Sequence, residues 1–273
     1  GAMILGYVMQ EDAIAALKFF EKLEQTDLKP NRAIYLSVTK ACGSLRAIEQ
    51  GRFAHSQIIK SGLESDVAVG TVLADMYIKC GSFDDGLRIF AGSFKEDVVM
   101  WNMAIKGCVL NGQRQMAFDM FNQLLQEGMH PCNLTFLNIV SACTADLDLY
   151  LVWGRIIHLH IIECGFHHTS CVSNSLINMY IKCGSFEDAQ QNFDTMDKKD
   201  SASWNVIIGG YVKDGDAKKA LTLFSEMQSM RIKPDIVTFL SISNAYGNLG
   251  DLEQAKKIHY HIMESGLELN TLM

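Results

Sequence analysis

Apolar residues along this chain recur with the spacing of amphipathic helices. Within residues 98–132, for example, one set falls on a single helical face: Met116, Ala117, Met120, Phe121, Leu124 and Leu125. Glycines break the chain between successive helical segments: Gly81, Gly112, Gly184, Gly215 and Gly250. No run of alternating apolar and polar residues indicates a strand. The pattern therefore predicts an all-α chain of helix–turn–helix units.

The same units return along the sequence. MYIKCGSF occupies residues 76–83 and again 179–186, and the WN of residues 101–102 returns at 204–205 with the same shift of 103 positions. Pro30, Pro131 and Pro234 recur at nearly the same interval. We expect these whole units: 32–66, 67–97, 98–132, 133–169, 170–200, 201–235 and 236–270. Residues 2–31 are expected to be the remainder of an earlier unit, and residues 271–273 the start of a further one. The segment TADLDLYLVW makes unit 133–169 two residues longer than unit 32–66.

A single helix pair cannot bury its apolar faces, whereas stacked pairs bury a continuous core. The repeat therefore predicts an α-solenoid that forms one continuous domain. The composition agrees with a folded chain, since 48% of the residues are hydrophobic and 20% are charged. No apolar run reaches the roughly 18 residues that a membrane helix needs.

Charge and cysteine usage narrow the candidate chemistry. The net charge of −7 argues against a protein that holds nucleic acid through bulk positive charge. None of the eight cysteines belongs to a C-x-x-C pair, so we expect reduced, packing thiols rather than disulfides. The histidines of HLH at 158–160 and HYH at 259–261 would point to different sides of a helix, so no zinc site is predicted. No catalytic or cofactor motif is present.

The units resemble pentatricopeptide repeats of the plant P-L-S type. Residues 201–235, SASWNVIIGGYVKDGDAKKALTLFSEMQSMRIKPD, resemble the P motif, and residues 66–90, DVAVGTVLADMYIKCGSFDDGLRIF, resemble the short S motif with its M-Y-x-K-C-G hallmark. Residues 36–66, LSVTKACGSLRAIEQGRFAHSQIIKSGLESD, resemble the long L motif. The order L, S, P, L, S, P, L covers residues 32–270, and the resemblance implies a right-handed superhelix. A tetratricopeptide array is the competing solenoid, but its uniform period of about 34 residues does not fit the unequal unit lengths.

The resemblance implies that each unit reads one base of single-stranded RNA with two side chains. One side chain lies early in the first helix, and the other is the last residue of the unit. The implied base-reading pairs are Thr71 with Asp97, Asn102 with Cys132, Asn174 with Asp200, and Asn205 with Asp235. In the family an Asn/Asp pair favours uracil, with cytosine second, and a Thr/Asp pair favours guanine. Asn102 with Cys132 departs from the pattern, and we expect a weak pyrimidine preference there.

Three units carry leucine at the first base-reading position: Leu36, Leu137 and Leu240. Leucine cannot hydrogen-bond a base edge, so these L units are expected to discriminate poorly. With the parallel polarity of the family, the predicted RNA core is 5′-NGYNUUN.

The family also places a small apolar residue, against which a base stacks, three positions before the first base-reading residue. Here these residues are Ala68, Val99, Cys171 and Ala202. Three lysines that share one position per unit are expected to contact phosphates: Lys79, Lys182 and Lys213. The competing interpretations are that the asparagines cap helices and that the lysines are solvated surface charges.

The resemblance implies a non-catalytic RNA-binding protein that recognises sites for C-to-U editing of transcripts in a mitochondrion or chloroplast. A deaminase-like domain is absent from these residues, so the chemistry is expected to be supplied elsewhere. The L units are candidate docking surfaces for accessory editing proteins, and no cofactor, membrane or small-molecule substrate is expected. The first alternative is RNA processing, stabilisation or splicing by occupancy of the RNA. The second is a protein-binding scaffold without an RNA ligand.

Overall fold

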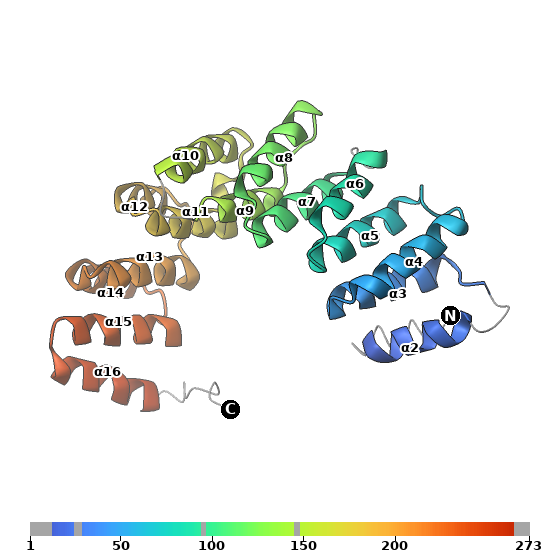
Figure 1. Ribbon diagram of the computed structural model, residues 1–273. Coiled ribbons are helices and arrows are strands. Elements are labelled where there is room, and N and C mark those ends of the chain that lie inside the picture. Colours follow the sequence, from blue (N-terminus) through green and yellow to red (C-terminus); the bar gives the residue numbers. More distant parts are fainter. Residues whose placement is uncertain (1–12, 25–28, 94–96, 145–147, 265–273) are drawn as a thin grey trace. The chain divides into compact units, whose positions relative to one another are not determined.

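The computed structural model describes residues 13–24, 29–93, 97–144 and 148–264, and these residues form fifteen α-helices and one 3-10 helix, without a strand (Figure 1). The predicted all-α fold of consecutive helix pairs is confirmed. Several predicted features lie partly or wholly outside the described residues: residues 2–12 and 25–28 of the first partial unit, residues 145–147 of the two-residue insertion, residues 265–270 of the last L unit, and residues 271–273.

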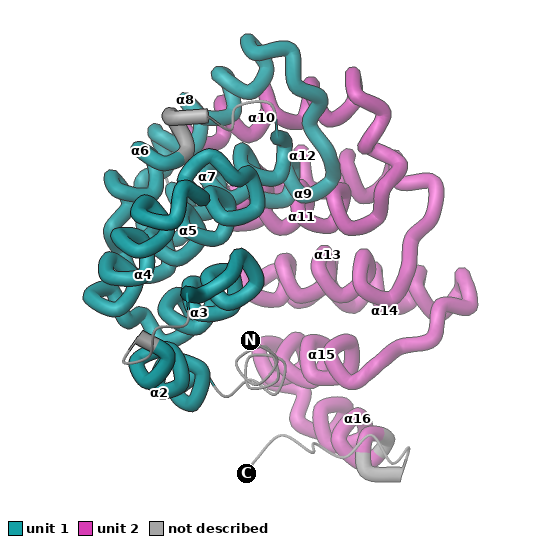
Figure 2. The backbone as a smooth tube through the Cα atoms, turned by 90° about the vertical axis from the view of Figure 1, so that its right-hand side faces the viewer, with its two compact units in different colours: residues 1–139 teal, residues 140–273 magenta. Residues whose placement is uncertain are grey.

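The chain divides into two compact units, residues 1–139 and 140–273 (Figure 2). The first contains these helices: α2 (Ala13–Glu24), α3 (Arg32–Leu45), α4 (Ile48–Lys60), α5 (Val67–Lys79), α6 (Phe83–Ser93), α7 (Val98–Leu110) and α8 (Arg114–Gln126). Helix α9 (Asn133–Ala142) contains the point of division. The second contains these: α10 (Asp148–Glu163), η1 (Phe166–His168), α11 (Ser170–Lys182), α12 (Phe186–Asp194), α13 (Ser201–Asp214), α14 (Ala217–Ser229), α15 (Ile236–Asn248) and α16 (Leu252–Glu264). The repeat boundaries and the single continuous domain stay predictions.

Within each compact unit, the first helices of successive pairs pack on one another. Helix α5 packs on both α3 and α7, and α13 packs on both α11 and α15. Six first helices also pack on the second helix that follows them along the chain, in the pairs α3–α4, α5–α6, α7–α8, α11–α12, α13–α14 and α15–α16. The glycines between these paired helices have a positive φ, which lets the chain reverse without strain: Gly81, Gly112, Gly184, Gly215 and Gly250.

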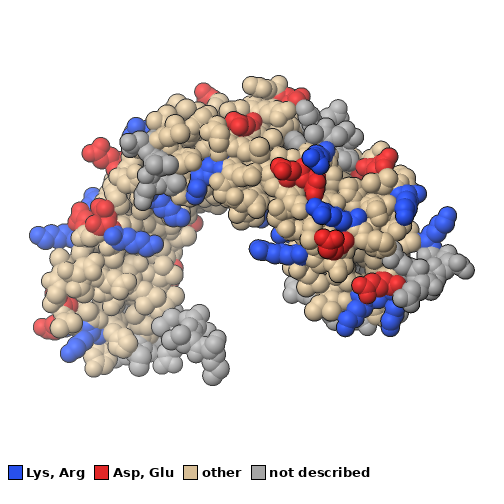
Figure 3. Space-filling model, in the orientation of Figure 1, with Lys and Arg blue, Asp and Glu red and all other residues tan. Residues whose placement is uncertain are grey.

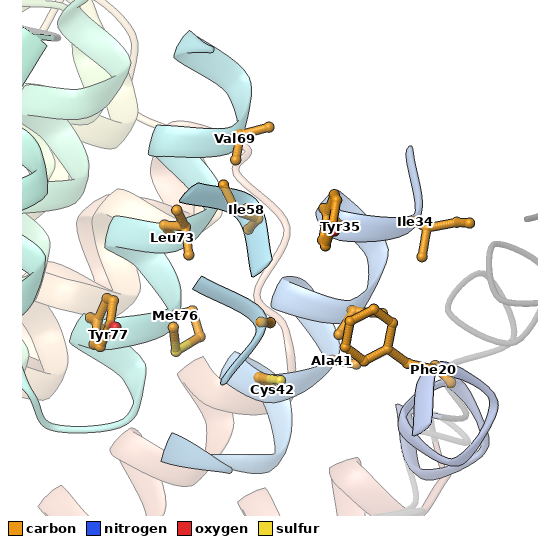
Figure 4. Close-up of a cluster of buried hydrophobic side chains, with 13 residues drawn as sticks. Phe20, Ile34, Tyr35, Ala41, Cys42, Ile58, Val69, Leu73, Met76 and Tyr77 are labelled. Carbon is orange, nitrogen blue, oxygen red and sulfur yellow. The ribbon is translucent and has the colours of Figure 1, made fainter. Parts of the chain in front are cut away.

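Side chains from four helices form a hydrophobic core in residues 1–139 (Figure 4). Phe20 of α2, Tyr35 of α3 and Ile58 of α4 are buried together with Met76 and Tyr77 of α5. The core thus joins helices of different predicted repeats, as expected for units that cannot bury their apolar faces alone.

The repeated octapeptide holds neighbouring helix pairs together. A Cβ atom added to Gly51 of α4 would lie 2.4 Å from Met76 Sδ, and one added to Gly107 of α7 would lie 2.6 Å from Ile78 Cγ2. The octapeptide of α5 therefore fills spaces left by glycines on the preceding and following pairs. The second copy makes the same two contacts: Met179 with Gly154, and Ile181 with Gly210.

All eight cysteines are free thiols, and the octapeptide cysteines donate to backbone carbonyls. Cys183 Sγ donates to the carbonyl oxygen of Cys143 at 3.1 Å, and Cys80 Sγ to that of Cys42 at 3.8 Å. Burial raises the pKa of the Cys42, Cys108 and Cys143 thiols to about 12, so these thiols stay protonated and unreactive. Among the described helices, none combines the length and hydropathy needed to cross a membrane.

Candidate functional site

The first base-reading positions all fall on the fifth residue of a first helix: Thr71 on α5, Asn102 on α7, Asn174 on α11 and Asn205 on α13. The predicted stacking residues lie three positions earlier, which places them on the same helical face one turn away. Val99 is 52% exposed, Cys171 and Ala202 are also exposed, and Ala68 is half-buried. Each first helix thus presents a small apolar side chain beside a candidate base-reading side chain.

Thr169 makes no side-chain capping bond, but at five other predicted unit ends the last residue caps the first helix of the next unit. Its side chain accepts a hydrogen bond from a backbone N–H group of the first turn at these positions: Asn31, Asp66, Asp97, Asp200 and Asp235. Asn102, Asn174 and Asn205 lie inside their helices and do not cap them. The capping interpretation therefore applies to the aspartates rather than to the asparagines, and it accounts for the aspartates without any ligand.

In residues 201–235, the two members of the pair contact each other directly. Asn205 Nδ2 donates to Asp235 Oδ1 at 2.9 Å and to Oδ2 at 2.8 Å. The hydroxyl of Thr238, on α15, donates to Asn205 Oδ1 at 2.6 Å. Burial opposes ionisation of Asp235, but hydrogen bonds from Thr238, Ser201 and Asn205 outweigh it and lower the pKa of the carboxyl group. The pair is therefore a preformed amide–carboxylate unit.

In residues 98–132 the equivalent pair is joined more weakly. Asn102 Nδ2 lies 3.4 Å from Cys132 Sγ, and a thiol is a weak acceptor. Asn102 is 3% exposed, and its Oδ1 has no hydrogen-bond partner among the described residues. Burial favours the neutral Cys132 thiol, but hydrogen bonds from Thr135 and Asn102 outweigh burial and lower its pKa.

The predicted pairs of Thr71 and Asn174 are not joined. The Thr71 hydroxyl donates to the carbonyl oxygen of Val67 at 2.7 Å, within its own helix. Asp200 accepts from the backbone and the hydroxyl of Ser203, both at 2.8 Å, and Asn174 Oδ1 is buried without a hydrogen-bond partner among the described residues. No hydrogen bond links Thr71 to Asp97 or Asn174 to Asp200 in the part of the chain that the structure describes. The members of these pairs are fewer positions apart along the chain than Asn102 and Cys132 or Asn205 and Asp235.

A hollow of about 250 Å³ lies between α5, α7 and α9, within residues 1–139. It is lined by the predicted stacking residue Val99, the predicted base reader Asn102 and the predicted phosphate contact Lys79. Two further lining residues, Lys106 and Leu134, were not predicted. Lys106 lies four residues after Asn102 on the same helical face, and Leu134 occupies the position of Val99 one repeat later, so the helical period could have identified both.

The three predicted phosphate-contacting lysines are exposed in the last turn of α5, α11 and α13. A positive charge there also complements the helix dipole, which is an alternative reason for their position. Lys79 Nζ pairs with Asp75 on its own helix at 2.6 Å. Basic and acidic side chains are interspersed on the face shown in Figure 3. Within the described residues, no three His, Cys, Asp or Glu side chains are grouped to hold a metal ion.

Comparison with protein families gives consistent matches along the chain. The PPR repeat family matches residues 199–248, the pentatricopeptide repeat domain matches residues 91–145, and the PPR repeat matches residues 171–201 and 237–267. Together these matches cover more than half of the chain.

Curated relatives come from Arabidopsis thaliana and are much longer than this chain. The pentatricopeptide repeat-containing protein At5g27110 is 34% identical over 262 residues, which are 96% of this chain and 38% of that protein. At1g11290, chloroplastic, is 35% identical over 271 residues, covering 99% of this chain and 33% of that protein. At2g03380, mitochondrial, is 32% identical over 265 residues, covering 97% of this chain and 38% of that protein. The chain thus spans between a third and two fifths of the length of these relatives.

A solved structure has the same fold. The crystal structure of the pentatricopeptide repeat protein PPR10 in complex with an 18-nt psaJ RNA element superposes with a TM-score of 0.73 at 19% identity, over 97% of this chain and 40% of that one. At this identity the likeness concerns the fold. The stacked helix pairs, the family matches and the relatives agree, and the chain belongs to the pentatricopeptide repeat family.

Proposed function

We propose that this chain binds single-stranded RNA and reads bases with side chains of its first helices. The observation that carries the proposal is the Asn205–Asp235 unit, in which a polarised amide lies one helical turn from the exposed Ala202. An amide offers both a donor and an acceptor to a base edge, and a small apolar side chain leaves room for a flat ring. The fold shared with PPR10, which was solved with RNA, supports the same ligand class.

The hollow between α5, α7 and α9 supports the proposal in the other compact unit. There an exposed apolar side chain, a buried amide and two lysines line one space, which matches the needs of a base and its phosphate. The leucines of the L units offer no hydrogen bond to a base, so their positions in the proposed core 5′-NGYNUUN are unspecified. The other positions of the core are read by Thr71, Asn102, Asn174 and Asn205 with their partners.

For the whole protein, we propose the recognition of sites for C-to-U editing in an organelle, with the deamination supplied elsewhere and the L units as docking surfaces for accessory factors. The alternating unit lengths support this assignment, and the relatives named chloroplastic and mitochondrial support an organellar location. Processing or stabilisation by RNA occupancy is the alternative role, since it needs the same RNA-binding surface.

The proposal is tested by measuring the affinity of the chain for a single-stranded RNA that contains 5′-GYNUU. We expect replacement of both uracils by adenine to weaken binding, because the amides of Asn174 and Asn205 then face a different base edge. Asn205→Ala should reduce discrimination at one uracil by about 1–3 kcal/mol, the range for bidentate base contacts.

Leu240→Ala is the matched control, since it changes the same helical position in a unit that cannot read a base. It should leave the discrimination unchanged. Equal affinity for the two RNAs would contradict base reading. A lack of RNA binding even at low salt would instead favour the protein-binding scaffold.

A further inference from the structure

The carboxylate of Asp235 has no acceptor site left for a base. Besides Asn205, it accepts from the backbone N–H of Thr238 at 3.0 Å on Oδ1 and from the Ser201 hydroxyl at 2.8 Å on Oδ2. A carboxylate offers about four acceptor sites, and the amide of Asn205 takes the other two. Asp235 therefore acts on a bound base through Asn205 rather than by direct contact.

The neighbours of Asn205 fix the orientation of its amide. A carboxylate only accepts hydrogen bonds, so the amide nitrogen must face Asp235 and Oδ1 must face the other way. Thr238 meets Oδ1 there with its hydroxyl at 2.6 Å, and the same hydroxyl oxygen accepts from the Asp235 N–H at 3.1 Å. The buried Thr238 hydroxyl also lies 3.1 Å from Asp235 Oδ1, but Asn205 Oδ1, at 2.6 Å, is the nearer acceptor for its single proton. Turning the amide over would lose these bonds and bring its oxygen against the carboxylate.

The fixed amide keeps one donor and one acceptor free. The two oxygens of Asp235 lie too close together to take both N–H bonds of Asn205 separately, so one N–H is shared between them and the second remains. One lone pair of Oδ1 also remains, because Thr238 uses the other. Uracil presents an N–H at N3 beside a carbonyl, whereas cytosine presents an acceptor at N3 beside an amino group. An amide in one orientation suits one pyrimidine, and the inverted amide suits the other.

We propose that Thr238 is a positioning residue that, together with Asp235, holds the Asn205 amide in one orientation and thereby makes this unit select uracil over cytosine. This inference rests on the proposed function, since it concerns the base that faces Asn205. Thr238 belongs to the following helix pair, so the specificity of one unit is completed by a buried hydroxyl of the next.

Residues 98–135 contain the same arrangement without its central carboxylate. Thr135 accepts from the backbone N–H of Cys132 at 3.0 Å and lies 3.5 Å from Cys132 Sγ. Asn102 Oδ1 has no partner in the described part of the chain, and only the weak bond from Asn102 Nδ2 to the Cys132 thiol orients this amide. The inference therefore assigns both pyrimidines to the unit of Asn102 and uracil to the unit of Asn205.

The test measures the affinity of the chain for 5′-GYNUU RNAs with uracil or cytosine at the base that faces Asn205. The unaltered chain should prefer uracil on the order of tenfold, within the range of a good bidentate base contact. Thr238→Val keeps the shape and removes the hydroxyl, so the ratio should fall below that of the unaltered chain, because Asp235 alone is then left to orient the amide. Thr238→Ser restores the hydroxyl and should restore the ratio.

Thr238 also forms a capping box with Asp235, so Thr238→Val is expected to lower stability as well. The ratio at the base facing Asn174 should remain unchanged and shows that the variant is folded. A Thr238→Val chain that keeps the preference at Asn205 would overturn the inference while leaving RNA binding intact.

A gain of selectivity provides the second test. Cys132→Asp places a carboxylate between Asn102 and Thr135, and the uracil preference at the third base of the core should rise on the order of tenfold. Cys132→Asp combined with Thr135→Val should gain less. An equal gain in both variants would overturn the role of the threonine. An unaltered chain that binds no RNA, or binds without any base preference, would remove the proposed function and this inference together.

Discussion

Ile181 and Gly210 show how closely the octapeptide fits its neighbours. A Cβ atom added to Gly210 would lie 2.4 Å from Cδ1 and 2.9 Å from Cγ1 of Ile181. The side chain of isoleucine is branched at Cβ and stiff at χ1, so it cannot turn aside easily. Gly209, the next residue along α13, has only Ser241 Oγ near its added Cβ, at 3.7 Å.

The two glycines should therefore respond in opposite directions to the same substitution. We expect Gly210→Ala to lower the free energy of unfolding by about 1–3 kcal/mol, as overpacked core sites do. Gly209→Ala should raise it by roughly 0.5–1 kcal/mol, because alanine is the better helix former. Urea denaturation followed by circular dichroism measures both. A similar effect of the two substitutions would show that Ile181 does not need the space.

The aspartates at the ends of the predicted units show which contacts can be predicted from the residue type and which cannot. An aspartate before a helical segment predicts a cap from sequence alone, and Asp66, Asp97, Asp200 and Asp235 all cap. Only the structure shows that Asp235 also holds Asn205, whereas Asp200 does not hold Asn174. That difference depends on the path of the intervening second helix, which local sequence does not specify.

At the scale of helices, one polar cluster occurs twice. In residues 1–139, His55 Nδ1 of α4 contacts the Tyr77 hydroxyl of α5 at 2.9 Å, and Arg52 pairs with Asp85 of α6 at 3.3 Å. In residues 140–273 the same contacts recur, with His158 and Tyr180 at 2.9 Å and Arg155 and Asp188 at 2.7 Å. The tyrosines belong to the octapeptide, so each copy of the octapeptide contacts the preceding helix pair through this cluster.

The buried histidines of this repeated polar cluster predict a loss of stability in weak acid. Burial lowers the pKa of His55 and His158, although Asp85 and Asp188 oppose the shift. Since the unfolded chain then binds more protons than the folded one, the stabilisation is present above about pH 6.5, the ordinary histidine pKa, and decreases as the pH falls below it. We expect the urea concentration at the midpoint of unfolding to decrease when the pH is lowered from 7.5 to 5.5.

The double variant His55→Asn/His158→Asn removes both titrations and keeps a polar group near the position of Nδ1. Its midpoint should depend less on pH over the same interval. His130→Asn changes an exposed histidine and serves as the control. An unchanged pH dependence in the double variant would show that other groups cause the acid sensitivity.

At the scale of the whole chain, the net charge of −7 limits the contribution of nonspecific electrostatics to RNA binding. Lys79, Lys182 and Lys213 are the proposed phosphate contacts. With about 0.7 counterions released per contact on single strands, the logarithm of the binding constant should fall with the logarithm of salt concentration with a slope of about −2.

Lys182→Ala should reduce the magnitude of this slope by about 0.7, whereas Lys60→Ala, at the end of the second helix α4, should leave it unchanged. Fluorescence anisotropy at several salt concentrations provides both values. Equal slopes for the two variants would assign Lys182 to the helix dipole or to solvent instead.

The sequence by itself determined the class of fold and the location of the candidate residues. Helical periodicity, the glycines between helices and the duplicated octapeptide predict stacked helix pairs. All three signals are regular spacings of residues along the chain, so they can be recognised without the tertiary structure. The spacing also places Asn102, Asn174 and Asn205 on equivalent turns of their helices. The tertiary structure decided which of these side chains are joined. Asn205, Asp235 and Thr238 meet because three successive helices bring together residues about thirty positions apart, and the hydrogen-bond geometry that orients an amide exists only after those helices have packed.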